Sequence, residues 1–420
     1  MILARGKNQD LTPMTNRDRR RFLQLLAASP LVSLLDLPSL VAQQSGSTSS
    51  TPDLIATVGD ALNVFDFEAI ARSKLPPWHW AWMSNGAEDG GTIRANREGF
   101  EHYQIRARRL VDVSKTDTSV TLFGKTWDTP IFLCPVSGHR MYNPQGELAT
   151  ARAAQARKHL QMLSTMTTTP VEEVNAARGE PVWFQLYTRP EWAQTRDLVK
   201  RVEAAGCPAL VFTVDLLGGR NTELFSRVQQ RNQQQCATCH KGNPLTDLTN
   251  RPMVNALRSS PDGKPEIATP TWEYIKRLKD TTSMKMLVKG IVTREDAELA
   301  MQHGVDGVFV SNHGGRADNT MRSTIDCVSD VVAGVKGRAP VFVDSGFRRG
   351  GDIFKALALG ATAVGVGRPY IWGLTAFGQE GVETVLDILR RELQLVMRQS
   401  GVTSIKGITK NHVTGLPGWR

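Results

Sequence analysis

From residue 130 onward, short apolar runs alternate with segments that carry apolar residues at helical spacing. Apolar runs of this length, bounded by polar turns, are typical of the buried strands of a parallel sheet. We predict eight such strands, at 130–135, 161–164, 182–187, 209–215, 284–289, 307–313, 340–346 and 363–368. Eight strands that alternate with helices indicate an α/β fold of the (β/α)8 TIM-barrel type.

The helices of this barrel are predicted at 146–159, 191–205, 294–303, 323–335, 351–359 and, near the C-terminus, 382–398. Residues 53–129 precede the first strand and carry Trp78, Trp80 and Trp82, which favours an N-terminal helical cap over one mouth of the barrel. The loop after the fourth strand, 218–271, is long and polar, and connections of this length are usually functional or mobile.

Composition and charge narrow the classes of function. The chain has 420 residues, enough for one large core, and carries a formal net charge of +10 with a pI of about 9.5. After residue 50 the basic residues are spread out rather than clustered, which argues against a nucleic-acid partner. A basic face that attracts anionic substrates, or that makes peripheral contact with a membrane, stays open.

The N-terminus carries a separate pattern. Residues 19–23 read Arg-Arg-Arg-Phe-Leu and begin a short apolar stretch that Asp36 interrupts. The stretch is shorter than the ~18 apolar residues of a membrane span, and the pattern resembles a bacterial twin-arginine export signal. We expect residues 1–45 to form this signal and a linker, residues 53–420 to form the functional domain, and the protein to be periplasmic. A basic amphipathic tail in the cytoplasm is the alternative.

Polar residues stand where the predicted strands end. In the segment 311–316, Ser-Asn-His-Gly-Gly-Arg, His313 lies three residues before Arg316. A titratable base beside a carboxylate-binding Arg suits proton removal next to an acid group. Active sites of such barrels lie at the C-terminal ends of the strands. The other strand-end candidates are Gln185, Tyr187, Thr213, Asp215, Lys289, Asp344, Gly367 and Arg368.

The last two predicted strands carry a second signal. Segments 344–350 and 365–369 combine glycines with Arg348 and Arg368 where helices begin. Glycines let backbone amides approach an anion, and helix N-termini and Arg side chains favour its charge. The segments predict a phosphate pocket and a mononucleotide such as FMN in it. The alternative is a Gly-rich turn with surface arginines.

The order and spacing of seven motifs identify a family. They are Ser-Asn-Gly-Ala-Glu-Asp at 84–89, Phe-Gln-Leu-Tyr at 184–187, Thr-Val-Asp at 213–215, Val-Lys-Gly at 288–290, and segments 311–316, 344–349 and 367–369. From about residue 67 onward the chain resembles the FMN-dependent α-hydroxy acid oxidase and dehydrogenase family, which includes glycolate oxidase, lactate oxidase and mandelate dehydrogenase. The resemblance implies an FMN-dependent α-hydroxy acid dehydrogenase domain over 53–420.

This resemblance implies oxidation of a small L-2-hydroxy acid to the 2-oxo acid. Export would leave no nicotinamide pool within reach, so we expect electrons to pass from reduced FMN to a quinone or cytochrome more readily than to oxygen. We also expect a homo-oligomer. Two other classes stay open: a periplasmic flavin or haem electron carrier or binding protein that has lost catalysis, and another FMN barrel such as an isomerase. Retention of His313, Asp215 and Arg316 favours the hydroxy acid enzyme.

The resemblance also implies residue roles. His313 would be the base, and Asp215 would stabilise the imidazolium that forms. Arg316 and Arg220 would bind the substrate carboxylate, and Tyr187 would bond to the substrate oxygen. The cofactor would contact Pro135, Ser137, Ser164, Gln185, Thr213, Lys289 and Ser311 around its ring, and Asp344, Gly346, Arg348, Gly367 and Arg368 along its ribityl chain and phosphate. Lys289 would also stabilise the charge of the reduced ring.

Three departures from the family pattern affect the pocket. Trp82 stands where the family usually has a carboxylate-binding Tyr. The first-strand motif appears as Pro-Val-Ser-Gly-His at 135–139, which alters the surroundings expected for the flavin. The segment between Asp215 and Arg220 is two residues shorter than usual. The substrate therefore need not be lactate or glycolate.

The cysteines raise a separate question. Cys236, Cys239 and His240 form a Cys-x-x-Cys-His signature of c-type haem attachment, and Met253 could be a second ligand. The loop has few large apolar side chains to bury a porphyrin, so a redox dithiol, a disulfide or a partial zinc site are alternatives. No other metal site is expected. Cys134 and Cys207 stand in apolar surroundings and are predicted to be core thiols.

Overall fold

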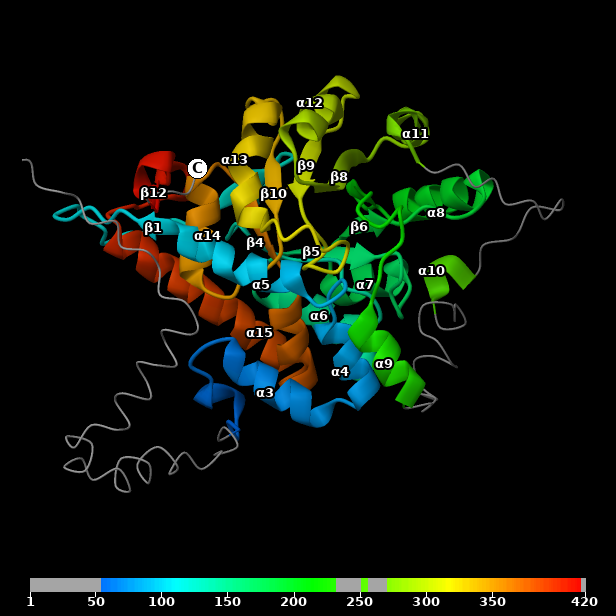
Figure 1. Cartoon of the computed structure of the whole chain (residues 1–420), viewed down its shortest axis with the longest axis horizontal. Coiled ribbons are helices and arrows are strands. Elements are labelled where there is room, and N and C mark those ends of the chain that lie inside the picture. Colours follow the sequence, from blue (N-terminus) through cyan, green and yellow to red (C-terminus); the bar gives the residue numbers. More distant parts are fainter. Residues whose placement is uncertain (1–53, 232–250, 256–269, 417–420) are drawn as a thin grey trace, which may run out of the picture. The chain divides into compact units, whose positions relative to one another are not determined.

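The computed structural model describes residues 54–231, 251–255 and 270–416. At its centre, eight parallel strands form a closed barrel in the order β10-β11-β4-β5-β6-β7-β8-β9, and pairing of β9 with β10 closes it (Figure 1). The strands are β4 (Ile131–Leu133), β5 (Leu160–Ser164), β6 (Trp183–Leu186), β7 (Ala209–Thr213), β8 (Lys285–Ile291), β9 (Gly307–Val310), β10 (Val341–Val343) and β11 (Ala363–Val366). The predicted TIM barrel is confirmed.

The predicted strands extend beyond several observed ones at their C-terminal ends. The apolar run predicted at 307–313, for example, leaves the sheet after Val310. The polar residues at the ends of these runs, among them Tyr187, His313 and Asp344, lie beyond the last strand residue at the barrel mouth.

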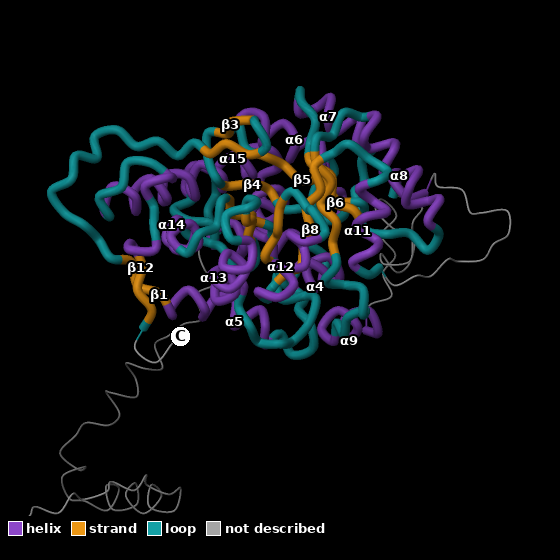
Figure 2. Tube along the Cα trace, turned by 90° about the horizontal axis from the view of Figure 1, so that it is seen from above, coloured by secondary structure: helices purple, strands orange, loops and turns teal. Residues whose placement is uncertain are grey.

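Helices surround the barrel, as the view from above shows (Figure 2). They are α6 (Gly146–Ala156), α7 (Val171–Arg178), α8 (Trp192–Ala204), α11 (Trp272–Lys279), α12 (Arg294–Gln302), α13 (Thr324–Val335), α14 (Gly350–Ala358) and α15 (Arg368–Gln399). The pattern did not predict α7 or α11, which are short. Helix α15 begins well before the predicted 382, and a kink at Phe377 and Gly378 divides it.

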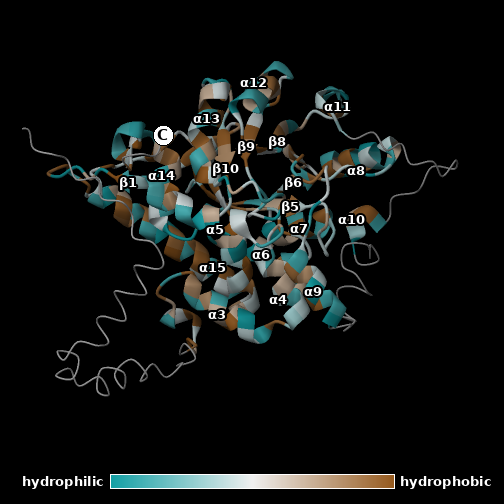
Figure 3. Cartoon of the chain, in the orientation of Figure 1, coloured by the Kyte–Doolittle hydropathy of each residue, from teal (hydrophilic) through white to brown (hydrophobic). Residues whose placement is uncertain are grey.

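Two apolar layers hold this arrangement together. Inside the barrel, Phe132 packs edge-on against Phe309 and Phe342, with ring centroids 5.5 and 5.9 Å apart. Outside, the other faces of the strands meet the helices, so the strands read as continuous apolar runs. Figure 3 shows mostly brown strands at the centre, whereas α9 (Glu223–Arg231) and α12 expose teal turns to solvent.

The segment before the barrel covers both of its mouths, not one. It comprises α3 (Phe65–Lys74), α4 (Pro77–Ser84), α5 (Gly91–Glu98), β1 (Tyr103–Ile105), β2 (Val120–Leu122) and β3 (Lys125–Trp127), with short 3-10 turns at Val58–Asp60 and Gly99–His102. Helix α4 lies at the C-terminal mouth. The β2–β3 hairpin closes the N-terminal mouth, where the ring of Phe123 packs 5.3 Å from that of Trp183. The prediction of a cap on one mouth missed this hairpin, whose two strands are only three residues long.

The remaining described elements are short. They are 3-10 turns at His139–Met141, Ile405–Gly407 and Lys410–His412, the short helix α10 (Pro252–Asn255) and β12 (Val413–Gly415), which pairs with β1. None of the described helices is long and apolar enough to cross a membrane. The predicted export signal at 1–45 and the Cys236, Cys239 and His240 motif lie outside the described residues, so both stay predictions.

Candidate active site

A cavity of about 570 Å³ opens at the C-terminal mouth of the barrel. Residues at or just after the strand ends line it, including Ser164, Tyr187, Lys289, His313 and Asp344. Parallel strands converge at this mouth, so side chains far apart in sequence meet there. Helix α4 adds Trp82 and Met83 to the wall.

His313 is held between an acid and a phenol. Its Nδ1 lies 2.9 Å from Oδ1 of Asp215, and its Nε2 lies 3.2 Å from the hydroxyl of Tyr187. With Nδ1–H donated to the carboxylate, the lone pair of Nε2 is available as a base. Burial lowers the pKa of His313, opposed by Asp215, so the imidazole is neutral at neutral pH.

The backbone at His313 has a left-handed conformation that residues other than glycine rarely adopt. Its φ is 58°, and Gly314 and Gly315 follow at 72° and 76°. The amide of His313 donates to Oγ of Ser311 at 3.1 Å, and the amide of Gly315 donates to Oδ1 of Asn312 at 3.0 Å. These bonds hold the turn that presents the imidazole at the cavity.

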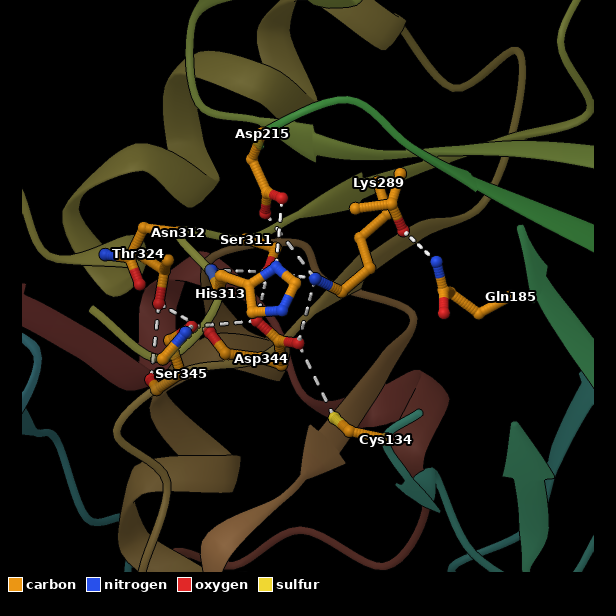
Figure 4. A network of polar contacts seen from close by, with 12 residues as sticks. Cys134, Gln185, Asp215, Lys289, Ser311, Asn312, His313, Thr324, Asp344 and Ser345 are labelled. Carbon is orange, nitrogen blue, oxygen red and sulfur yellow. Dashed lines mark hydrogen bonds and ion pairs between the residues drawn. The ribbon is translucent and has the colours of Figure 1, made fainter. Parts of the chain in front are cut away.

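Lys289 occupies the centre of a buried polar network (Figure 4). Its Nζ donates to Oγ of Ser311 at 2.9 Å and lies 3.6 Å from Asp215 and 3.9 Å from Asp344. Ser311 in turn donates to Asp344 at 2.6 Å. Burial alone would lower the pKa of Lys289, but the two carboxylates outweigh it and raise the pKa. Lys289 is therefore a fixed positive charge beneath the cavity.

Asp215 is anionic in this network. Burial alone would raise its pKa, but Lys289 and His313 together hold the pKa below its usual value. The carboxylate therefore keeps a full charge to place against an imidazolium at position 313.

Two arginines flank Trp82 at the cavity wall. The guanidinium carbons of Arg316 and Arg220 lie 4.9 and 5.2 Å from the centroid of the indole ring. Burial, Arg220 and Arg368 lower the pKa of Arg316 to about 9, and its Nε has no hydrogen-bond partner in the structure. Two cations at a buried wall attract an anion such as a carboxylate.

A second pair of arginines, Arg348 and Arg368, also lines the cavity. Burial lowers the pKa of both Arg348 and Arg368 to about 10, with Arg97 also acting on Arg348 and Arg348 acting on Arg368. The guanidinium of Arg368 donates to the carbonyl oxygens of Met83, Gly314 and Asn85 at 3.0, 2.8 and 3.0 Å. Arg368 thus also ties α4 to the turn that carries His313.

Comparisons with known proteins cover the part of the chain that contains this site. Residues 71–415 match the model of the FMN-dependent dehydrogenase family. The chain belongs to this family. Glycolate oxidase 3 of Oryza sativa subsp. indica is 41% identical over 355 residues, which cover 84% of this chain and 95% of that protein. A peroxisomal (S)-2-hydroxyacid oxidase of Arabidopsis thaliana is 39% identical over 358 residues, 84% of this chain and 96% of that protein.

Solved structures agree with the sequence comparisons. A mandelate oxidase variant with (S)-mandelic acid is 32% identical at a TM-score of 0.74, over 85% of this chain and 99% of that chain. A variant of an active chimera of (S)-mandelate dehydrogenase is 31% identical at a TM-score of 0.75, over 84% and 99%. The family and fold predicted from the sequence are confirmed.

The cavity of this FMN-dependent dehydrogenase fits its cofactor. The volume lies within the roughly 300–1,000 Å³ usual for small-molecule sites. Arg348 and Arg368 form no ion pair with a carboxylate among the described residues, which suits a phosphate, and Gly346 and Gly367 line the same end. Pro135, Ser137 and Ser164, which are expected to contact the flavin ring, line the same cavity. When bound, FMN supplies the two-electron acceptor.

Two residues that are expected to contact the cofactor, Gln185 and Thr213, are buried and bonded to the cavity residue Ser164. Nε2 of Gln185 donates to Oγ1 of Thr213 at 3.0 Å, and Oγ of Ser164 donates to Oε1 of Gln185 at 3.1 Å. The structure therefore joins Gln185 and Thr213 to Ser164, the member of the three that lines the cavity.

The structure adds one feature at the expected phosphate site. The N-terminus of α14, predicted to face an anion, is satisfied by the dehydrogenase's own carboxylates. Asp352 accepts from the amides of Arg348 and Arg349 at 2.9 and 3.1 Å, and Glu392 accepts from Gly350 at 2.8 Å. Asp352 belongs to the first turn of α14 and Glu392 to α15. The polar residues at the strand ends do not predict these two contacts.

Sequence reasoning missed several cavity residues. They are Met83, Cys134, Tyr142, Met166, Arg189 and Arg251. Of these, Cys134 and Tyr142 had a usable signal, because they stand at and shortly after the first strand end. Arg189 and Arg251 had none, since a charged residue in a loop usually faces solvent.

The predicted core thiols and metal ligands also have defined places. Cys134, Cys207 and Cys327 are buried free cysteines, and Sγ of Cys134 lies 3.5 Å from Asp344. Met253, weighed as a haem ligand, is fully buried, and its sulfur accepts from the amide of Val171 at 3.4 Å. Across the described ranges, no three His, Cys, Asp or Glu side chains gather as metal ligands.

Proposed function

We propose that this FMN-dependent 2-hydroxy acid oxidase or dehydrogenase converts an L-2-hydroxy acid to its 2-oxo acid in the periplasm and passes the electrons to a respiratory carrier. The observation that carries the reaction is the position of His313, whose Nε2 faces the cavity and Tyr187 while Nδ1 is bonded to Asp215. A neutral, oriented imidazole is what removal of a substrate proton requires.

The residues around His313 bind the substrate and stabilise the charges that the reaction creates. Arg316 and Arg220 bind the substrate carboxylate and so place the neighbouring carbon and its hydroxyl at the imidazole. Asp215 stabilises the imidazolium once His313 has taken a proton. The hydroxyl of Tyr187 donates to the substrate oxygen, and Lys289 keeps a positive charge beneath the flavin site.

The relatives support this substrate class and its handedness. They include a glycolate oxidase, an (S)-2-hydroxyacid oxidase and mandelate oxidase structures, one of them with (S)-mandelic acid. The intact pair of His313 and Asp215 argues against an electron carrier that has lost catalysis.

The acceptor and the location rest on the N-terminal pattern. A twin-arginine signal at 19–23 would deliver the folded protein outside the cytoplasm, away from nicotinamide cofactors. A quinone or cytochrome is then the acceptor we favour over oxygen. Covalent haem at Cys236, Cys239 and His240 stays a prediction, with a dithiol or disulfide as its alternative.

Anaerobic flavin reduction tests the reaction. The purified protein is mixed with a panel of L- and D-2-hydroxy acids, and bleaching of the flavin absorbance is followed. We expect bleaching with L-acids and not with D-acids. The substrate-reduced protein is then mixed in parallel with oxygen, a quinone analogue and cytochrome c. Fast reoxidation by oxygen alone contradicts the respiratory acceptor, and a flavin that no 2-hydroxy acid reduces contradicts the reaction.

A further inference from the structure

The cavity holds more positive charge than a single small hydroxy acid requires. Its lining includes one acidic side chain, Asp344, which already bonds to Ser311. Against it stand seven cations: Arg189, Arg220, Arg251, Lys289, Arg316, Arg348 and Arg368. The cofactor accounts for Lys289, Arg348 and Arg368, and one carboxylate accounts for Arg220 and Arg316. Arg189 and Arg251 remain.

Arg251 has surroundings of its own. It is 2% exposed, and one of its terminal nitrogens lies 3.9 Å from the sulfur of Met141. Its guanidinium lies so close to Gly138 that a Cβ there would come within 2.6 Å of it. Arg251 therefore packs against the loop that follows the first barrel strand, and it forms part of the cavity wall.

Arg189 differs from Arg251: its backbone amide is hydrogen-bonded, whereas its guanidinium has no ion pair with a described residue. Its amide donates at 2.9 Å to Oγ1 of Thr195, a fully buried residue of α8. Its side chain is partly buried and lines the cavity, and its Nε is buried with no hydrogen-bond partner among the described residues. It forms no ion pair with any described residue. A partly desolvated guanidinium without an anion is costly unless a ligand brings one.

Arg189 also stands apart from the carboxylate-binding pair. Arg220 contributes to the lowered pKa of Arg316, whereas burial is the only cause that lowers the pKa of Arg189. Arg189 follows Tyr187 by two residues, and both side chains line the cavity. The position suits a second anionic group carried by the same molecule whose first carboxylate meets Arg316.

We propose that Arg189 binds a second carboxylate, so that the preferred substrate is an L-2-hydroxy dicarboxylic acid. The inference rests on the proposed oxidation of 2-hydroxy acids. The second carboxylate stays unchanged in the reaction and serves recognition alone. Two charge-assisted contacts at opposite ends of one short molecule would fix the position of its hydroxyl-bearing carbon at His313.

Paired substrates and a matched control test this proposal. L-malate and L-2-hydroxyglutarate are compared with the monoacids L-2-hydroxybutyrate and L-2-hydroxypentanoate, whose side chains are uncharged, in anaerobic flavin reduction, with the parent protein and Arg189→Met. We expect the parent to favour the diacids, and Arg189→Met to reduce this preference by ~10- to 100-fold. Arg196→Met, at an exposed Arg of α8 that pairs with Asp197, should leave the preference unchanged.

A binding measurement removes the dependence on turnover. The 2-oxo diacid oxaloacetate and the monoacid 2-oxobutyrate are titrated against the oxidised protein, and the shift of the flavin spectrum gives both dissociation constants. We expect Arg189→Met to weaken oxaloacetate selectively. A parent that prefers monoacids, or a variant that weakens diacids and monoacids equally, overturns the role of Arg189. A flavin that none of these four acids reduces also overturns the role of Arg189, whereas a flavin that no acid of the wider 2-hydroxy acid panel reduces overturns the proposed function.

Discussion

Nδ1 of His313 lies 2.9 Å from Oδ1 of Asp215, although the two residues follow strands that are not neighbours in the barrel. Strand β8 runs between them and contributes Lys289, whose Nζ lies 3.6 Å from the other oxygen of Asp215. One carboxylate thus contacts a titratable base and a permanent cation. This arrangement keeps Asp215 charged and His313 neutral until it accepts a proton.

Replacing His313 by Asn should remove the base and keep the fold. Asn tolerates the φ of 58° at this position better than Gln does, and it cannot accept the substrate proton. We expect flavin to stay bound and its reduction to slow by ~10²- to 10⁴-fold. The control is His102→Asn, at a His that contacts Asp326 away from the cavity. Reduction at close to the parent rate would remove His313 from this role.

Replacing Asp215 by Asn should change the pH profile in a defined direction. His313 acts as a base in its neutral form, and its pKa lies below the usual value near ~6.5, so protonation of His313 should lower kcat/KM on the acid side of the profile. Asp215 raises the pKa of His313, so its loss lowers that pKa and moves the acid limb to still lower pH. The plateau should drop by ~10- to 100-fold because the imidazolium loses a charged partner. A limb that moves upward contradicts this pairing.

Replacing Arg316 by Met should weaken substrate more than cofactor. The guanidinium stands at the cavity without an ion pair in the described chain, so its loss removes a charge-assisted contact worth ~1.5–3 kcal/mol to the substrate carboxylate. The measurement compares apparent substrate affinity in anaerobic reduction with FMN retention on dilution. Equal losses in both, or unchanged substrate affinity, would show that Arg316 acts elsewhere.

Trp82 should contribute a hydrogen bond as well as a surface for the arginines. Its Nε1 is buried and has no partner in the structure, while Arg316 and Arg220 stack on its ring. We expect Trp82→Phe to weaken substrate binding by ~2- to 10-fold, and Trp82→Tyr to recover part of the loss by restoring a donor. Identical constants for the Phe and Tyr variants would show that only the stacking surface matters.

Export should depend on the Arg pair at the N-terminus. The twin-arginine route reads both guanidinium groups, so changing Arg19 and Arg20 to Lys should leave the precursor in the cytoplasm. The matched control is Arg17→Lys, which keeps the same net charge. Fractionation followed by immunoblotting measures the result. Unchanged periplasmic amounts would favour a basic tail with no export role.

The sequence by itself determined the barrel and most of its strand-end chemistry. A buried parallel strand is apolar on both faces, so each strand was recognisable as an apolar run. The polar residues after the strands lie at the same mouth of the barrel, because the strands are parallel. His313, Asp215, Lys289 and Tyr187 were found in this way, and they meet around one cavity. Motif order then predicted the family and its cofactor, as the comparisons confirm.

Tertiary structure alone decided which residues outside the recognised motifs contribute to the site. Arg189 reads as an ordinary loop cation, and only the closed barrel turns it into a cavity wall with an unpaired charge. The sequence pointed to Trp82 and Arg368, but only the structure shows that Trp82 lies between two arginines and that Arg368 bonds to carbonyls 283–285 residues away in sequence. Local patterns report burial and periodicity, whereas such contacts depend on how loops from different strands pack at one mouth. That packing decides which cations remain unpaired and therefore which anions the site can bind.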